Sequence, residues 1–302
     1  MMRGAHKFAV AVRNPQGNIV IHEQPLNAAL YRGRISKTPF VRGLIGLWDA
    51  LGLGTRALMW SADVAIKEDE NDTASFSGPV AYGTLAVSLL LGIGIFFLLP
   101  TTAASGVEQL LSLQAYPFVV NLIEGVIQLA LLIGYISLIG LMPDVKRLFG
   151  YHGAEHKTIN AYEAGAELTP EIVAKYPIEH PRCGTAFLLT VAFVSVLVFS
   201  LFGRPPFLLL LLSRVILIPV IAGIAYEIIR FTAKNLHNPL IRIIIIPNLA
   251  LQHLTTRQPD LTMIEVAIAA FKRVLVSESL MSEAEATPIP VTMSEASVAP
   301  GD

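Results

Sequence analysis

Two imidazoles and a carboxylate stand within five consecutive residues of this chain, as His152, Glu155 and His156. If the segment is helical, the i, i+3 and i+4 spacing directs all three side chains from one face of the helix. The order H-x-x-E-H is the inverted zincin motif, in which both histidines bind zinc and the glutamate activates a bound water. The motif therefore predicts a divalent-metal site, most simply for zinc, in a metal-dependent hydrolase with Glu155 as the catalytic base.

Further metal ligands are needed, because catalytic zinc usually has three ligands from the protein. Glu163 lies on the same helical face two turns further on, and His180 and Cys183 form an H-x-x-C pair just before an apolar stretch. Glu227 stands at the end of a later apolar stretch. Each of the four is a candidate ligand beside His152 and His156. A second interpretation of these side chains is a polar network that holds helices together without a metal.

The composition indicates where such a site would lie. Hydrophobic residues make up 53% of the chain, charged residues only 15%, and the mean hydropathy is +0.59. These values exceed those of ordinary soluble domains, so the chain is expected to be an integral membrane protein in a lipid bilayer. The net charge of -1 gives no reason to expect a nucleic-acid partner.

Four apolar stretches are long enough to cross a bilayer. They cover residues 80–99, 118–142, 185–202 and 207–229. The expected fold is an all-α polytopic membrane protein with four transmembrane helices. Nearly all Lys and Arg residues lie in the two terminal regions and in the loop 143–184, whereas the connectors 100–117 and 203–206 carry only Arg204. The positive-inside rule then places both termini and the His-rich loop in the cytoplasm of a multi-pass cell-membrane protein.

Outside the spans the patterns predict smaller elements. Strand-like residues 7–13 and 18–23 flank the turn Asn14-Pro15-Gln16-Gly17 and predict a β-hairpin that docks on another element. Residues 145–168 are expected to form the helix that carries the motif. A capping box from Thr262 to Glu265 is expected to start an amphipathic helix.

The chain is accordingly expected to divide into a β-hairpin region (1–39), an amphipathic interfacial helix with a linker (40–79), transmembrane helices 1 and 2 (80–142), a cytoplasmic His/Glu-rich loop with a helix (143–184), transmembrane helices 3 and 4 (185–229), an interfacial segment with an amphipathic helix (230–276) and a disordered tail (277–302).

A second group of polar residues lies inside the predicted spans. Asn121, Glu124 and Gln128 share one face of the second span, and Arg214 stands at a matching depth in the fourth. Charges inside a membrane are usually paired, so Glu124 and Arg214 are predicted to meet. The pair either fixes the register of the helices or lines the path of a transporter or channel, which is an alternative function. A non-catalytic membrane scaffold is a further alternative function. Besides the lipid bilayer, the expected partner is a second copy of the chain or another membrane protein.

Five blocks of residues, in order, resemble the YqhQ-like bacterial membrane proteins, a family of unknown function that is labelled a predicted metal-dependent enzyme. The blocks are Tyr151-His152-Gly153-Ala154-Glu155-His156-Lys157-Thr158, Tyr162-Glu163-Ala164-Gly165, His180-Pro181-Arg182-Cys183-Gly184-Thr185, Ala222-Gly223-Ile224-Ala225-Tyr226-Glu227 and Leu254-Thr255-Thr256-Arg257-Gln258-Pro259-Asp260. Members of that family usually carry a lead-in of the form G-G-Q-A-V-x-E-G-V before the segment that begins here with Met1. A site that used the glutamate of that lead-in is expected to be incomplete in this sequence.

Overall fold

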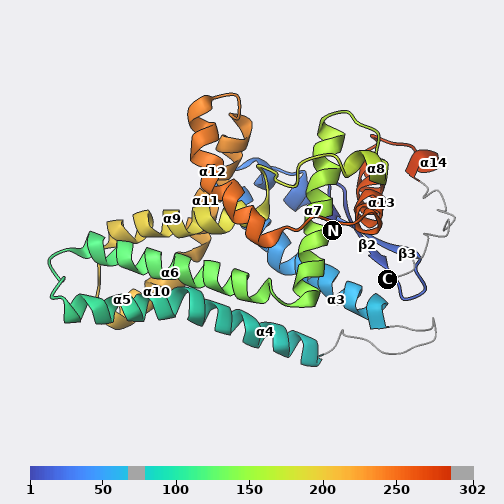
Figure 1. Ribbon diagram of the computed structural model, residues 1–302. Coiled ribbons are helices and arrows are strands. Elements are labelled where there is room, and N and C mark those ends of the chain that lie inside the picture. The colour runs from blue at the N-terminus through green and yellow to red at the C-terminus, as the bar shows by residue number, and fades with distance from the viewer. Residues whose placement is uncertain (67–78, 287–302) are drawn as a thin grey trace, which may run out of the picture.

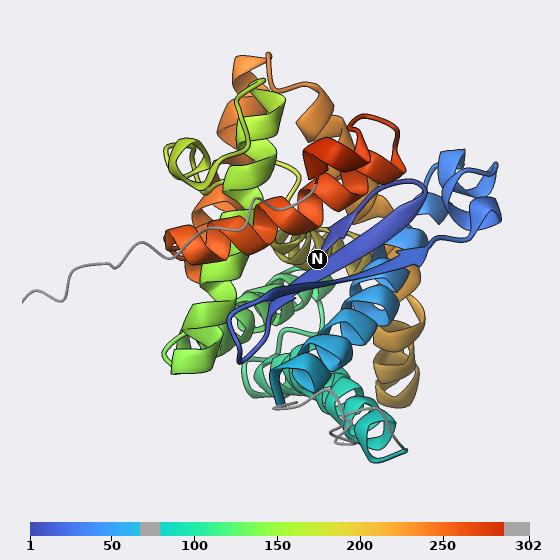
Figure 2. The same ribbon diagram turned by 90° about the vertical axis from the view of Figure 1, so that its right-hand side faces the viewer.

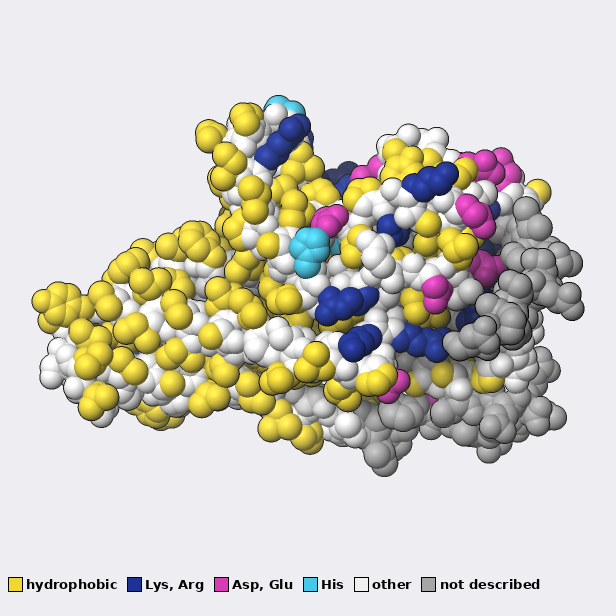
Figure 3. Space-filling model, in the orientation of Figure 1, with side chains coloured by type: hydrophobic (Ala, Val, Ile, Leu, Met, Phe, Trp, Pro, Cys, Tyr) yellow, Lys and Arg dark blue, Asp and Glu magenta, His cyan; other side chains and the backbone are white. Residues whose placement is uncertain are grey.

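The computed structural model describes residues 1–66 and 79–286, so the predicted linker at 67–77 lies outside the described residues. Figure 1 shows two parts. Long apolar helices extend side by side in one direction, and a small sheet with several shorter helices forms the other end. In the space-filling view of Figure 3, hydrophobic side chains cover the first part, while most charged side chains gather on the second. This distribution is typical of a membrane-embedded part joined to a water-exposed part.

The first candidate span is longer than predicted. Helix α4 (Pro79–Ile93), a π-helical turn (Gly94–Leu98) and helix α5 (Leu99–Leu110) form one continuous helix, which is apolar enough to cross a membrane over Tyr82–Leu110. The prediction that the span ends at residue 99 is wrong. The helix continues through its polar residues because Thr101 and Ser105 donate their hydroxyl hydrogen bonds back to backbone carbonyls one turn earlier.

Two further spans agree with the prediction, and the fourth does not. Helices α6 (Pro117–Ile139) and α9 (Gly184–Phe202) are straight candidate spans. The predicted fourth span is instead two helices, α10 (Phe207–Ile216) and α11 (Ile218–Lys234), which meet at an angle of 45°. Pro219 explains the break, because proline has no N–H to donate and its ring displaces the carbonyl four residues earlier. The described residues therefore contain three helices able to cross a membrane, or four if the bent pair is one span.

The N-terminal hairpin is part of a three-stranded antiparallel sheet. Strands β2 (Lys7–Arg13) and β3 (Ile19–Pro25) form the predicted hairpin, and β1 (Met2–Arg3) pairs with the other edge of β2. Gly17 takes a φ of +87° in the turn, a conformation that glycine adopts without strain. The structure thus confirms the hairpin and adds a third strand to it.

Helices cover both faces of this sheet. Phe8 and Val10 of β2 pack with Ala57 of α3 (Gly54–Ile66), whereas Ala9 packs with Ala270 of α13 (Leu261–Ser277). Successive residues of a strand point to opposite faces, so the alternation along β2 places one helix on each side. Figure 2 shows the strands between these two helices. The hairpin therefore docks on other elements, as expected, and these elements, α3 and α13, are distant in the sequence.

The expected helix at residues 40–66 is present as α2 (Val41–Trp48), a π-helical turn (Asp49–Leu53) and α3. The short helix α1 (Ala28–Tyr31) and a 3-10 turn (Ile35–Lys37) connect it to the sheet. Helix α12 (Pro239–Thr255) covers the segment expected to lie at the interface, and follows α11 in a helical hairpin at the top of Figure 1.

The motif segment is helical, as predicted, but its helix α7 (Pro143–Glu163) ends five residues earlier than expected. Gly165 adopts a φ of +71° after the last turn, which is how many helices terminate. The predicted capping box is replaced by Asp260, whose carboxylate accepts from Met263 N. Glu265, the expected partner in that box, instead forms an ion pair with Arg13.

Part of the predicted disordered tail is ordered. Residues 278–286 fold back on α13 through the short helix α14 (Glu283–Ala286), and Ala286 is buried. Glu278 accepts hydrogen bonds from the backbone N–H groups of Ala5 and His6, at 2.7 and 2.8 Å, and lies 2.9 Å from His6 Nδ1. Residues 287–302 lie outside the described part. The helix α8 (Pro170–Val173) completes the described elements.

The contacts of Glu278 make the stability of the sheet dependent on pH. Burial raises the pKa of Glu278, but the hydrogen bonds from His6 and Ala5 lower it by more than burial raises it. The pKa of this carboxyl is therefore below its usual value. A carboxyl whose pKa is lower in the folded than in the unfolded state stabilises the fold above its unfolded pKa and loses that contribution as the pH falls. We expect Glu278→Gln to lower the free energy of unfolding by about 1–2 kcal/mol at neutral pH and to reduce the loss on acidification. Hydrogen exchange of β2 amides at neutral and acidic pH measures this effect, and an equal acid response in both proteins would contradict it.

Candidate metal centre

Three of the predicted ligands converge beside α7. One ligand atom each from His152, His156 and Cys183 lies within 4.8 Å of the other two. His152 Nε2 is 3.4 Å from Cys183 Sγ, and the rings of the two histidines are 4.4 Å apart at their centroids. The histidines come from successive turns of α7, and Cys183 is the residue that caps the start of α9.

The second nitrogen of each histidine is held by a backbone carbonyl. His152 Nδ1 donates to Thr255 O at 2.9 Å, and His156 Nδ1 donates to Ile178 O at 2.5 Å. With the proton on Nδ1, the lone pair of each ring is on Nε2, the atom available for a metal. A carbonyl that fixes the tautomer and the ring orientation in this way is typical of histidines that bind metals.

Cys183 is chemically prepared to act as a thiolate. Burial would raise the pKa of this thiol, but hydrogen bonds and charge from His152 and His156 lower it to about 5. The thiolate is the form that binds metal ions. Two imidazole nitrogens and one thiolate form a donor set suited to zinc.

His180 lies next to the cluster but is not part of it. Its ring centroid is 5.8 Å from that of His156, and its backbone N and O are both held by the side-chain amide of Gln252, each at 2.9 Å. Burial, together with the nearby His156, lowers the pKa of His180 to about 4, so the ring is neutral. Its Nε2 is buried and has no hydrogen-bond partner in the described part of the chain, and Glu163 Oε2 lies 3.8 Å from it.

Two predicted ligands lie elsewhere. Glu163 is 45% exposed and forms an ion pair with Arg182, because seven residues of α7 carry it about 10 Å along the helix from His156. Glu227 binds Arg42 of α2 through both carboxylate oxygens and accepts from Phe40 N at 3.0 Å. The structure therefore does not bring Glu163 or Glu227 to the cluster. Arg42, the partner that the sequence analysis missed, was visible only as one charge in an amphipathic stretch.

Glu155 faces a cavity beside the cluster. The cavity encloses about 910 Å³, and both His152 and Glu155 line it. The Glu155 side chain is 36% exposed, and the amino group of Met1 lies 3.9 Å from it. Burial lowers the pKa of His152, but Cys183 and, to a smaller extent, the charge of Glu155 raise it above its usual value. A carboxylate in this position is able to exchange protons with a water molecule beside the cluster.

Gly153, inside the motif, permits the close packing that holds His152. A Cβ atom at Gly153 would lie 2.3 Å from Arg257 O. The segment after α12 runs against α7 at this point, with Arg257 N donating to Phe149 O at 3.0 Å. This approach brings Thr255 O within reach of His152 Nδ1, so the glycine controls the orientation of the ligand.

We expect Gly153→Ala to destabilise the protein by about 1–3 kcal/mol, although alanine favours helices, because two backbone segments would have to separate. Gly150→Ala on the same helix is the matched control. Its Cβ would meet the flexible Met263 side chain, with Sδ at 2.7 Å, so only that side chain has to move. Thermal unfolding of both variants checks the difference, and equal stabilities would contradict it.

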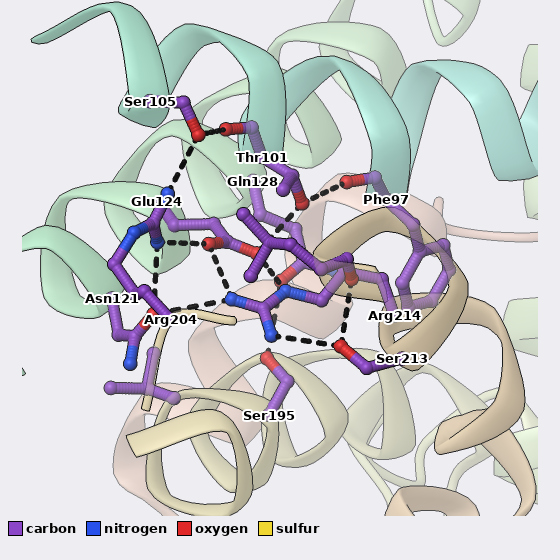
Figure 4. A network of polar contacts seen from close by, with 12 residues as sticks. Phe97, Thr101, Ser105, Asn121, Glu124, Gln128, Ser195, Arg204, Ser213 and Arg214 are labelled. Atoms are coloured by element: carbon purple, nitrogen blue, oxygen red, sulfur yellow. Dashed lines mark hydrogen bonds and ion pairs between the residues drawn. The ribbon is translucent and has the colours of Figure 1, made fainter. Parts of the chain in front are cut away.

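A second polar cluster lies between the apolar helices (Figure 4). Arg214 is fully buried, and its Nε and Nη2 donate to the two oxygens of Glu124 at 2.7 and 2.8 Å. Its guanidinium also lies 3.9 Å from the centre of the Phe199 ring. Glu124 and Arg214, predicted to meet, thus form a bidentate ion pair that joins α6 to α10.

Arg204 is a further member of this cluster that the sequence analysis did not assign. From the connector before α10, it donates to Glu124 Oε2 at 3.1 Å, Glu108 Oε2 at 2.9 Å and Ser105 Oγ at 2.8 Å. Asn121 Oδ1 accepts from both arginines, at 3.0 and 3.2 Å. Two arginines face two glutamates, so the cluster carries no net charge. Its partners Ser105 and Glu108 lie past the predicted end of the first span, which explains why Arg204 was not assigned to the cluster.

Comparison with known proteins identifies the family. Residues 38–277 match a family described as a protein of unknown function (DUF1385). The chain is 32% identical over 293 residues to an uncharacterized protein, YqhQ, of Bacillus subtilis (strain 168), an alignment that covers 94% of this chain and 91% of the relative. No solved structure matches the chain. The chain therefore belongs to the DUF1385 family, in agreement with its resemblance to the YqhQ-like proteins.

Proposed function

We propose that this protein is a membrane-bound, zinc-dependent hydrolase. The observation that carries the proposal is the convergence of His152 and His156 with Cys183, each histidine being held through Nδ1 by a backbone carbonyl. Three protein ligands leave a fourth position of a tetrahedral site open, which distinguishes catalytic from structural zinc sites. A zinc ion held there would supply a Lewis acid and make bound water acidic near neutral pH.

Glu155 supplies the base in this proposal. Its carboxylate lies on α7 one turn from His152 and faces the same cavity. It would take a proton from the attacking water and deliver it to the leaving group, so that an ester or amide and one water become an acid and an alcohol or amine. His180 is neutral, and because its Nδ1 accepts from Arg182 N, its Nε2 carries the proton and is able to donate to a group held beside His156.

The proposed location is the cytoplasmic face of the bacterial cell membrane. The basic residues around the described spans support this side, by the positive-inside rule. α7 supports a site close to the bilayer, because it begins at Pro143, directly after the candidate span α6.

The alternative of a transporter or channel has less support. Both carboxylate oxygens of Glu124 accept hydrogen bonds from Arg214 or Arg204, in a cluster that carries no net charge. A charge that is fully paired holds helices in register and offers little to a passing ion. The cluster therefore supports a structural role.

The test uses the full-length protein purified in detergent. We expect about one zinc per chain by mass spectrometry and hydrolysis of a nitrophenyl ester that stops when dipicolinate removes the metal. Glu155→Gln should retain the zinc and lose about 100- to 10,000-fold in kcat, because a general base contributes that much. Metal-free protein with unchanged thermal stability would refute the metal site, and an unchanged kcat in Glu155→Gln would refute the role of the base.

A further inference from the structure

The cavity beside the candidate metal centre is hollow because small side chains line two of its walls. On α3, one helical face presents Gly54, Ala57 and Ser61 to it, and on α13 the lining includes Ala267 and Ala270. These positions follow helical spacing, so each wall is a continuous strip of small residues. The volume of about 910 Å³ lies in the range of pockets that enclose whole ligands.

Helix α7 forms a further wall, and the chemical character of its side chains changes along the cavity. Arg147, Leu148, Tyr151, His152 and Glu155 line the cavity in sequence. Eight residues of helix separate the first from the last, a rise of about 12 Å. One end of this wall is therefore cationic, the middle is apolar, and the other end carries the candidate ligand and the candidate base.

The cationic end lies close to the membrane. Arg147 stands one turn from the start of α7, and only three residues separate α7 from the end of α6, a candidate span. Arg147 is exposed, and although its charge acts on Asp260, no close ion pair engages its guanidinium within the described residues. Arg13 lines the same cavity, and its Nε is buried without a hydrogen-bond partner in the described ranges. Arg13 is already paired with Glu265, so the exposed Arg147 is the group suited to an anionic lipid head group.

We propose that the cavity binds one acyl chain of an anionic membrane lipid, whose head group lies against Arg147 and whose chain lies along α3 and β2. Val10 and Val12 of β2, and Leu58 of α3, provide the apolar surface for the chain. Five residues of helix, a rise of about 7.5 Å, separate Arg147 from His152, so the ester linkage of a lipid whose head group contacts Arg147 lies at the level of His152. This inference rests on the proposed hydrolase for its chemistry, and it assigns the substrate of that site to the class of membrane lipids.

The experiment uses the full-length protein in phosphatidylcholine vesicles that contain a phosphatidylglycerol probe with a diazirine on one acyl chain. On illumination, we expect labelled peptides from α3, α7 and β2 in addition to those from the lipid-exposed spans. Ser61→Trp should reduce the labelling of the cavity peptides by at least about tenfold, because the indole fills the space of the chain. Ala62→Trp on the same helix is the matched control, since Ala62 does not line the cavity, and it should label as the unaltered protein does.

The charge of the head group is tested separately. Arg147→Ala should lower the preference of the cavity for the phosphatidylglycerol probe over a phosphatidylcholine probe by about fivefold. Excess inorganic phosphate should not compete, because the chain provides most of the binding. Labelling confined to the spans, or equal labelling of cavity peptides in Ser61→Trp and Ala62→Trp, would overturn the inference.

The labelling of the cavity by the lipid probe does not depend on a bound metal. His156→Ala removes a candidate ligand that does not line the cavity, so it should weaken zinc binding and keep the cavity labelling. Cavity labelling in a protein that holds no zinc would keep the lipid site and remove the hydrolase. Zinc binding without cavity labelling would keep the metal site and remove the lipid.

Discussion

Replacing His156 by alanine is expected to weaken zinc binding by the full-length protein by at least about a hundredfold, since even groups that only support a ligand contribute up to that much. Cys183→Ala should have an effect of the same size. Both side chains are buried and face the point where the ligand atoms converge. Competition with a chromogenic zinc chelator measures the affinity of each variant.

Two substitutions beside the site are the controls. Glu155→Gln should keep the affinity, because Glu155 lies outside the group of converging ligand atoms. Lys157→Met, a buried change on the same helix, should also keep it, because Lys157 Nζ donates to the carbonyls of Ala174 and Tyr176, away from the cluster. An equal loss of affinity in all four variants would mean that α7 had lost its structure, and no loss in any would remove the candidate metal centre.

Glu124→Gln is expected to lower the free energy of unfolding by about 3–5 kcal/mol, the largest effect on stability that we predict. The substitution preserves shape but removes the negative charge that two arginines share. Arg214, fully buried, would then remain as a charge without compensation. Titration with SDS, followed by the loss of helical circular dichroism, measures the change in detergent micelles.

A double variant separates the ion pair from its charges. Glu124→Leu together with Arg214→Met replaces both charges with apolar groups, while Arg204 keeps its bond to Glu108. Its stability should exceed that of either single variant, since a buried pair can often be replaced by hydrophobic residues with little loss. Gln128→Leu, which removes only the 3.2 Å bond from Ser195, should cost about 1 kcal/mol. Additive losses in the double variant would contradict this account.

The sequence was informative wherever one short-range pattern determined the outcome. Apolar length located α6 and α9, and β-branched alternation around Asn14-Pro15-Gln16-Gly17 located the hairpin. The predicted ends of the spans were wrong where contacts with other elements, or a proline, outweighed the pattern of apolar residues. The first span runs past residue 99 because Arg204 and the backbone satisfy its polar residues. The fourth span is broken at Leu217, a consequence of Pro219 that apolar length alone does not reveal.

In the candidate site, too, local spacing predicted some residues correctly, whereas contacts with distant elements could not be predicted. Helical spacing correctly placed His152 and His156 together, and the H-x-x-C pair identified Cys183 as a neighbour of the cluster. Glu163 and Glu227 were assigned by proximity along a helix and by analogy, and each is neutralised by an arginine from another element. No pattern in one sequence specifies which arginine a glutamate will meet. The carbonyl partners of the two imidazoles, Thr255 and Ile178, were also inaccessible, because backbone acceptors carry no residue signature.

The packing of β2 between α3 and α13 limits how the chain can thread a bilayer. Residues near the two ends of the described chain are in contact, so they lie in the same compartment. A chain that starts and finishes in one compartment crosses the boundary an even number of times. If the three straight helices all cross, one further segment has to cross with them, because an odd count would separate the sheet from the helix that covers it, and the bent pair α10 and α11 is the longest apolar candidate. The parity of the crossings is thus fixed by a contact in water, independently of the charges in the loops.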